Sequence, residues 1–297
     1  MIIVLTGATG SGKSRLAIAL ANSIGGEIVN GDAFQVYKGI EIATAAPSEE
    51  EKKLAKHHLY SFLDVNDGYD ISRYQKDLRA KIEEVLSRGS VPIICGGSGL
   101  YLRAALYDYD LSVDTKHVDM SKYQDMDNES LHKVLEELDA KEAEKIHMNN
   151  RIRVMRAIEI CLASETSKSE MIEKQSHKPI YDDCYFFVLK RDRNELYPLV
   201  EKRVDEMVKN GLVEETLSMI EKYGREAPAF KAIGIKEFFP YLDGMVKLED
   251  AINTIKTNTR HYIKRQETFF RHQFEVVEIS NVDDILKVIK ENDDVTA

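Results

Sequence analysis

The stretch that decides the fold is Gly7-Ala8-Thr9-Gly10-Ser11-Gly12-Lys13-Ser14, near the amino end of the 297-residue chain. It follows an apolar run, Ile2 to Leu5, and precedes a segment whose apolar residues recur at helical spacing. The pattern GxxxxGK[ST] between a strand and a helix is typical of a phosphate-binding loop, whose backbone N–H groups surround a diphosphate. We therefore predict that residues 7–14 bind a diphosphate, with Lys13 supplying charge and Ser14 holding Mg²⁺.

Strands and helices alternate beyond this loop. The sequence predicts a second strand at Glu27 to Asn30, an amphipathic helix over about Ser72 to Ser87, and a third strand at Val91 to Cys95. Such alternation is typical of a parallel sheet, whose ligands bind at the carboxyl ends of the strands. The expected fold class is therefore α/β, with the phosphate-binding loop at one edge of a parallel sheet flanked by helices.

The middle of the chain has a different pattern. Residues 108–179 contain charged helical segments, such as Glu129 to Ala140 and Arg151 to Ala163, and no β-branched runs. We interpret them as a helical insertion domain within a discontinuous core made of residues 1–107 and 180–297. The later core is expected to contain a strand at Tyr185 to Lys190, helices over Leu196 to Tyr223 and Leu248 to Phe274, and a strand at Phe274 to Ile279.

Composition narrows the class of protein. No apolar run is long enough to cross a bilayer and the first residues lack the features of a signal peptide, so we expect a cytoplasmic protein without membrane contact. Cys95, Cys161 and Cys184 are odd in number and far apart, which predicts neither a disulfide framework nor a zinc site. The formal charge of −10 opposes nucleic-acid binding, although local basic clusters matter more. Nothing in the sequence requires more than a monomer.

Asp32 comes directly after the second predicted strand, in Asn30-Gly31-Asp32-Ala33-Phe34-Gln35. In a parallel sheet this position lies near the phosphate-binding loop, where a carboxylate acts as a general base or contacts Mg²⁺ through water. The plainer interpretation is an Asx turn or a helix N-cap. Because of the neighbouring loop, we favour the general base.

Several further blocks of sequence occur together with the loop. They are DAFQVYKGIEIATAAP at residues 32–47, HHL at 57–59, GGSGLYLR at 96–103, IHMNNRIR at 146–153, RVDEM at 203–207, GIKE at 234–237 and TRHYIKRQ at 259–266. Through these blocks, in this order, the chain resembles the tRNA dimethylallyltransferases, also called isopentenyl-diphosphate:tRNA transferases. The resemblance covers nearly the whole chain.

The resemblance implies a reaction and its catalytic groups. These enzymes transfer a dimethylallyl group from dimethylallyl diphosphate to N6 of adenosine 37 in tRNA, which yields N6-isopentenyladenosine and diphosphate. Asp32 matches the general base, Arg203 matches an arginine that stabilises the diphosphate, and Thr9 and Ser98 match residues that contact the diphosphate or the reacting amine. Mg²⁺ is the implied cofactor. Without the resemblance, a solvated helix charge beside Glu201 and Asp205 is the better explanation of Arg203.

The resemblance also implies contacts with the anticodon stem-loop of tRNA, by the insertion and by two sequence blocks. These blocks are Asp32-Ala33-Phe34-Gln35 and Asn149-Asn150-Arg151-Ile152-Arg153. A third candidate comes from charge: between residues 256 and 272, Arg260, Lys264 and Arg265 belong to five basic side chains against one acidic one. A solvated helix face explains that cluster equally well. We expect the adenine to leave the anticodon stack and enter a channel above the phosphate-binding loop.

Three other functions share parts of this pattern. A P-loop small-molecule kinase would bind ATP on the loop and use Asp32 as the base for a substrate hydroxyl. A transferase of the cytokinin type would prenylate free adenine nucleotides and would not need the blocks that face RNA. An RNA chaperone with a decayed site would not need Lys13, Ser14 and Asp32, which are all present.

Overall fold

The computed structural model describes residues 1–111, 118–164, 166–176 and 178–296. The chain divides into two compact units: Met1–Leu106 with Tyr181–Ala297, and Tyr107–Ile180. The second unit extends one residue beyond each end of the expected insertion, residues 108–179, of which residues 112–117, 165 and 177 lie outside the described part. Each unit has its own hydrophobic core and is described separately.

A six-stranded parallel sheet forms the centre of the larger unit, in the order β3-β2-β4-β1-β5-β6. The strands are β1 (Ile2–Gly7), β2 (Gly26–Asn30), β3 (His57–His58), β4 (Val91–Cys95), β5 (Cys184–Leu189) and β6 (Val277–Ile279). The predicted α/β fold class is thus confirmed. In this order β2, β4 and β1 are neighbours, so the loops that follow them leave the same edge of the sheet side by side.

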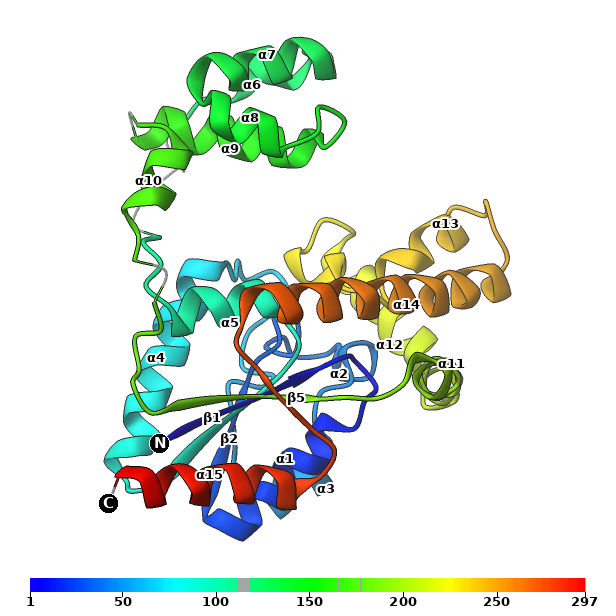
Figure 1. Ribbon diagram of the computed structural model, residues 1–297. Helices are drawn as coiled ribbons and strands as arrows, with labels where there is room; N and C mark the ends of the chain where they lie inside the picture. Colours follow the sequence, from blue (N-terminus) through cyan, green and yellow to red (C-terminus); the bar gives the residue numbers. More distant parts are fainter. Residues whose placement is uncertain (112–117, 165, 177, 297) are drawn as a thin grey trace. The chain divides into compact units, whose positions relative to one another are not determined.

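Helices cover both faces of the sheet, which explains why its central strands are apolar almost throughout. The layer with α1 (Lys13–Ile24) and α15 (Val282–Thr296) packs on the side chains of Ile3 and Leu5. The opposite layer contains α4 (Ile71–Ser87), α5 (Gly99–Leu106) and α14 (Leu248–Gln273), as Figure 1 shows. Alternate residues of each strand therefore serve two separate packing layers.

The remaining core helices lie beyond the carboxyl edge of the sheet or in its loops. They are α2 (Glu41–Thr44), α3 (Glu49–Leu54), α11 (Arg193–Lys209), α12 (Leu212–Tyr223), the short 3₁₀ helices η1 (Pro228–Lys231) and η2 (Lys236–Phe238), and α13 (Phe239–Leu242). The single helix expected over Leu196 to Tyr223 is wrong. Gly211 has φ of 98° and ends the first helix, so the chain turns there before α12 begins.

The smaller unit is a helical domain, as its sequence predicts. Its helices are α6 (Ser121–Gln124), α7 (Asn128–Leu138), α8 (Ala140–Lys145), α9 (Arg151–Ser164) and α10 (Lys168–Lys174). Leu131 and Leu135 of α7 pack on Val154 and Ile158 of α9, and all four are fully buried. The helix expected over Glu129 to Ala140 ends early because Asp139 caps the next helix, accepting from the N–H of Glu142 at 3.0 Å.

The structure describes the state of the three cysteines and allows a search for membrane-spanning helices. Cys95 and Cys161 are buried, Cys184 is partly buried, and all three are free thiols. Within the described part of the chain, no helix combines the length and the apolar character that crossing a membrane requires.

The packing of β5 leads to a stability prediction. Phe187 is fully buried in the sheet, whereas Val277, its partner in the register with β6, is 43% exposed. We expect Phe187→Ala to lower the free energy of unfolding by about 3–5 kcal/mol, because it leaves a cavity in the core. Val277→Ala should lower it by less than about 1 kcal/mol. Urea denaturation of both variants tests this, and equal losses would contradict the packing described.

Candidate active site

The phosphate-binding loop connects β1 to α1 through two glycines in the left-handed region. Gly10 has φ of 77° and Gly12 has φ of 100°, conformations that other residues adopt only with strain. The turn directs the free N–H groups of the first turn of α1 toward one point, where the helix dipole also favours an anion. The side chain of Lys13 folds over the loop, and its Nζ donates to the carbonyl oxygens of Gly7 at 2.9 Å and Ala8 at 2.8 Å.

Two side chains of α1 are placed to act on a bound diphosphate. The pKa of Lys13 is lowered to about 8, chiefly by burial and also by the charge of Arg203, while Cys95 and Asp32 oppose the shift. Ser14 is exposed in the first turn of α1, and its hydroxyl is a hard oxygen ligand of the kind that Mg²⁺ prefers. The residues present therefore fit a Mg²⁺ ion held jointly by the protein and a phosphate group.

Asp32 lies in the loop after β2 and takes part in an Asx turn. Its Oδ1 accepts from the N–H of Phe34 at 2.9 Å, while its own N–H donates to Asn30 Oδ1 at 2.8 Å. Burial raises the pKa of Asp32, although the N–H groups of Phe34 and Gln35, the charge of Lys13 and the Ser98 hydroxyl oppose the shift. The turn and the general base are compatible, because the turn fixes a carboxylate that also lines a cavity.

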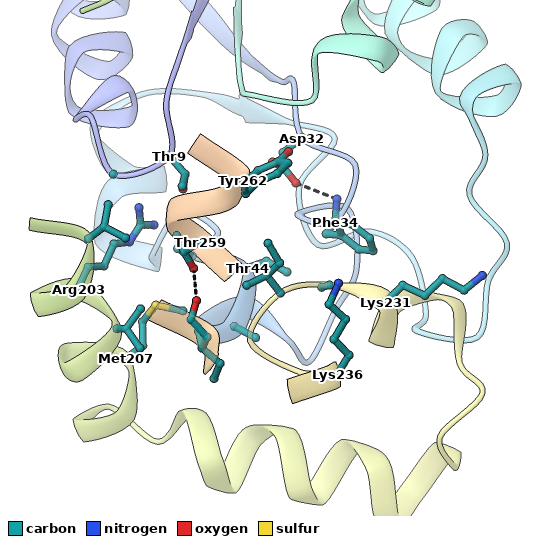
Figure 2. Close-up of a pocket in the computed structure, with 18 of the residues that line it drawn as sticks. Thr9, Asp32, Phe34, Thr44, Arg203, Met207, Lys231, Lys236, Thr259 and Tyr262 are labelled. Atoms are coloured by element: carbon teal, nitrogen blue, oxygen red, sulfur yellow. Dashed lines mark hydrogen bonds between the residues drawn. The ribbon is translucent and has the colours of Figure 1, made fainter. Parts of the chain in front are cut away.

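The cavity has a volume of about 240 Å³ and opens beside the phosphate-binding loop. Thr9, Asp32 and Tyr262 lie at one end of it and Lys231 and Lys236 at the other (Figure 2). The wall between these ends is largely apolar. It includes Ala43, Val200, Val204, Met207, Ile233 and Ile255. The site thus joins a polar end beside the loop to an apolar wall that can hold a hydrocarbon group.

Arg203 lines this cavity from α11, which overturns the solvated-charge interpretation. Its acidic neighbours face the other way: Glu201 forms an ion pair with Arg260, and Asp205 Oδ1 lies 2.6 Å from Lys256 Nζ, both on α14. Burial lowers the pKa of Arg203, but a guanidinium keeps its charge in proteins. The structure thus places a partly desolvated cation beside Thr9 and Asp32.

Ser98 holds the loops after β4 and β2 together. Its N–H donates to Gly31 O at 3.1 Å, and its hydroxyl oxygen accepts from the N–H of Ala33 at 2.9 Å. The two loops touch directly, since a Cβ on Gly96 would lie 2.1 Å from the carbonyl group of Gly31. Ser98 therefore fixes the backbone next to Asp32.

The other candidate residues of the core differ in where they lie. Phe34 and Arg265 line the cavity, and the guanidinium of Arg265 lies 5.7 Å from the centre of the Tyr262 ring. Gln35, in contrast, uses its amide to hold the cavity wall, donating to Thr44 O and Ala45 O at 3.0 Å each. Arg260 is paired with Glu201, and Lys264 is exposed on the outer side of α14.

In the helical unit, Arg151 differs from its neighbours. Its guanidinium donates to the carbonyl oxygens of Tyr123 at 3.0 Å and of Gln124 and Met126 at 2.6 Å each, so it holds the start of α9 to the end of α6 and the loop that follows. The other candidates of this block, Asn149, Asn150, Ile152 and Arg153, are exposed. Ile152 is 84% exposed, which is unusual for an isoleucine.

Several residues of this site, among them Tyr262 and Gln266, had no role predicted from the sequence. Tyr262 lines the cavity and burial raises its pKa, while Gln266 joins two loops of the sheet edge. A signal was available, because Ile255, Thr259, Tyr262 and Gln266 lie on one face of a helix at spacings of three and four. Lys231 and Lys236 were also missed. Glu237 anchors their loop, accepting from Asn258 Nδ2 at 2.8 Å and the N–H of Gly234 at 2.9 Å.

Fold and site together define an α/β protein of the P-loop class with a partly apolar cavity beside the loop. Comparison with known proteins specifies the family. Residues 35–273 match the sequence profile described as IPP transferase. The chain belongs to the IPP transferase family.

Individual relatives agree with this. A tRNA dimethylallyltransferase of Exiguobacterium sibiricum is 39% identical over 279 residues, which cover 92% of this chain and 88% of that protein. Among solved structures, a tRNA delta(2)-isopentenylpyrophosphate transferase of Staphylococcus epidermidis is 33% identical with a TM-score of 0.72, covering 98% of this chain and 99% of that one. A eukaryotic dimethylallyltransferase acting on tRNA is 30% identical with a TM-score of 0.81, covering 95% and 74% respectively.

The pKa of Lys13 leads to a prediction about anion binding. We expect the affinity of the free protein for inorganic diphosphate to fall as the pH rises through about 8, because Lys13 then loses its proton and its charge. Lys13→Arg should bind diphosphate with little change over the same range, since a guanidinium stays protonated. Isothermal titration calorimetry between pH 6.5 and 9.5 measures both. Parallel profiles for the two proteins would contradict the role given to Lys13.

Proposed function

We propose that this chain transfers the dimethylallyl group of dimethylallyl diphosphate to N6 of adenosine 37 in tRNA. The observation that carries the proposal is the cavity, in which a phosphate-binding loop, a buried carboxylate and an apolar wall adjoin one another. Membership of the IPP transferase family and relatives named as tRNA dimethylallyltransferases support the same reaction.

In this reaction the bond between C1 of the prenyl group and the diphosphate oxygen breaks, and a bond between C1 and N6 forms. The exocyclic amine is a weak nucleophile, so its proton has to be removed as the new bond forms. Asp32 accepts that proton, and its raised pKa makes it a stronger base than an exposed carboxylate. The electron pair of the broken bond leaves with the diphosphate.

The departing diphosphate is stabilised by groups that are already in place. The N–H groups of the loop, Lys13 and Arg203 surround the position where negative charge develops, and they require little rearrangement. The Ser14 hydroxyl would help to hold Mg²⁺, which would supply further charge neutralisation when bound. Thr9 also lines the cavity, and we assign it a contact with the C1–O bond that breaks.

The apolar wall argues against the kinase alternative. Val204, Met207 and Ile255 offer hydrophobic contact to a five-carbon group and no hydrogen bond to an acceptor hydroxyl. The cations of the cavity argue against a free adenine nucleotide, because Lys231, Lys236 and Arg265 together attract a longer polyanion. A tRNA whose adenine is extruded into the cavity uses both features.

We further propose a set of residues that bind the RNA. Phe34, Lys231, Lys236 and Arg265 contact the extruded nucleotide and its phosphates, while Gln35 supports the cavity wall. In the helical unit, the exposed block around Ile152 and Arg153 contacts the anticodon stem-loop, and Arg151 keeps that block in shape. Lys264 contributes through long-range attraction from the outer side of α14.

One chain suffices for the proposed chemistry. Every residue assigned to it belongs to the unit formed by residues 1–106 and 181–297. We therefore propose that the protein acts as a monomer, in the cytoplasm, where its tRNA substrate is found.

Replacement of Asp32 tests the chemical step. Asp32→Asn keeps an oxygen for the N–H of Phe34 but removes the base, so kcat should fall by about 10²- to 10⁴-fold while tRNA affinity stays within a few-fold. The assay incubates labelled dimethylallyl diphosphate with unmodified tRNA or with AMP, and includes an ATP phosphorylation control.

Asp64 offers a matched control, because it accepts from the N–H of Asn66 at 3.0 Å in an exposed turn. Asp64→Asn should keep full turnover. Label on AMP alone, phosphate transfer from ATP, or an unimpaired Asp32→Asn protein would contradict the proposed function.

A further inference from the structure

Gln266 is a polar side chain buried in the middle of α14, with 4% of its surface exposed. Both ends of its amide are engaged with backbone. Oε1 accepts from the N–H of Thr9 at 2.9 Å, and Nε2 donates to the carbonyl oxygen of Gly97 at 3.0 Å. The amide therefore joins the loop after β1 to the loop after β4.

The approach of the second loop is unusually close. A Cβ on Gly97 would lie 2.1 Å from Gln266 Nε2, so only glycine admits this hydrogen bond. The N–H of Thr9, for its part, is engaged by Gln266 and is not offered to an anion. The backbone of Thr9 and that of Gly97 are thus both positioned to bond the amide of Gln266.

The connection continues to the proposed general base. Ser98 follows Gly97 directly, and its hydroxyl accepts from the N–H of Ala33, the residue after Asp32. A series of hydrogen bonds therefore runs from Thr9 through Gln266 and the Gly97–Ser98 backbone to the loop of Asp32. It spans the three neighbouring strands β1, β4 and β2.

We infer that Gln266 is a positioning residue, which fixes the separation between the diphosphate-binding loop and the carboxylate of Asp32. The inference rests on the proposed function, since it concerns the distance between leaving group and base. Only an uncharged side chain that both donates and accepts satisfies Thr9 and Gly97 together. A displacement of about 1 Å between reacting groups can cost about 10²-fold in rate, which sets the expected effect.

Gln266→Glu tests the hydrogen bonds separately from the size of the side chain, because glutamate and glutamine have nearly the same shape. A glutamate carboxylate accepts from Thr9 but cannot donate to Gly97, whereas its protonated form does both. At pH 8 we expect kcat about 10²-fold below the wild-type value, with the KM for dimethylallyl diphosphate and for tRNA changed by less than about threefold. As the pH falls, the ratio of variant to wild-type kcat should rise.

The comparison uses this ratio because other groups near Gln266 also titrate. They are Tyr262 on α14, Asp32 after β2, Lys13 on α1 and Cys95 at the end of β4, and the guanidinium of Arg265 is a further charged neighbour, next to the Tyr262 ring. All are present in both proteins, so changes that they cause largely cancel. Gln266→Met, which keeps the length of the side chain and loses both hydrogen bonds, should have a low kcat at every pH.

Gln75 provides the matched control. It is also a buried glutamine, 8% exposed, and its Nε2 donates to Ala104 O at 2.7 Å, between α4 and α5. Gln75→Glu should lower the melting temperature without a pH-dependent recovery of kcat. If Gln266→Glu does not fold at pH 8, Gln266→Met decides the question.

The outcomes distinguish the inference from the function on which it rests. A wild-type protein that does not prenylate tRNA overturns the proposed function. An active wild type together with a Gln266→Met protein of full kcat overturns the positioning role alone. A folded Gln266→Glu protein whose kcat ratio is constant with pH does the same, as does a loss confined to KM.

Discussion

The parallel pairing of β2, β4 and β1 is the constraint on which the site depends. Parallel strands end at a common edge, so Asp32, Ser98 and Thr9, which are far apart in the sequence, come within reach of one another. The approach is completed by backbone contact, because Gly96 lies against Gly31 with no room for a side chain. A change in strand order would separate base and phosphate-binding loop even if every residue of the motifs were kept.

Helix α14 completes the site at that edge of the sheet because its different faces make different contacts. One face presents Ile255, Thr259 and Tyr262 to the cavity and Gln266 to the loops beneath it. A neighbouring face holds α11 through Lys256 and Arg260, which pair with the acidic residues on either side of Arg203. These ion pairs are partly exposed and add little stability individually. They do orient α11, and α11 directs Arg203 into the cavity.

The sequence predicted most of the sheet and the phosphate-binding loop, because both depend on local pattern. A single short segment contains the apolar run of β1, the spaced glycines and the helical period of α1. It predicted less well what depends on tertiary contact. The two-residue strand β3 has no periodicity of its own, and the roles of Arg203 and Gln266 depend on which neighbour each helix face meets. The resemblance to a known family predicted that Arg203 belongs to the site, where it does line the cavity, whereas charge pattern alone would have assigned it to solvent.

Charge distribution decides how an acidic protein can bind RNA. With a formal charge of −10, most of the surface repels phosphate, and the basic stretch of α14 is less available than its composition suggests because Lys256 and Arg260 are paired. The cavity, in contrast, is lined by the cations Lys231, Lys236 and Arg265. Repulsion elsewhere and attraction at the cavity together favour one orientation of the RNA over nonspecific binding. Such an arrangement limits total affinity, but a modification enzyme must also release its product, so selectivity of approach matters more than tight binding.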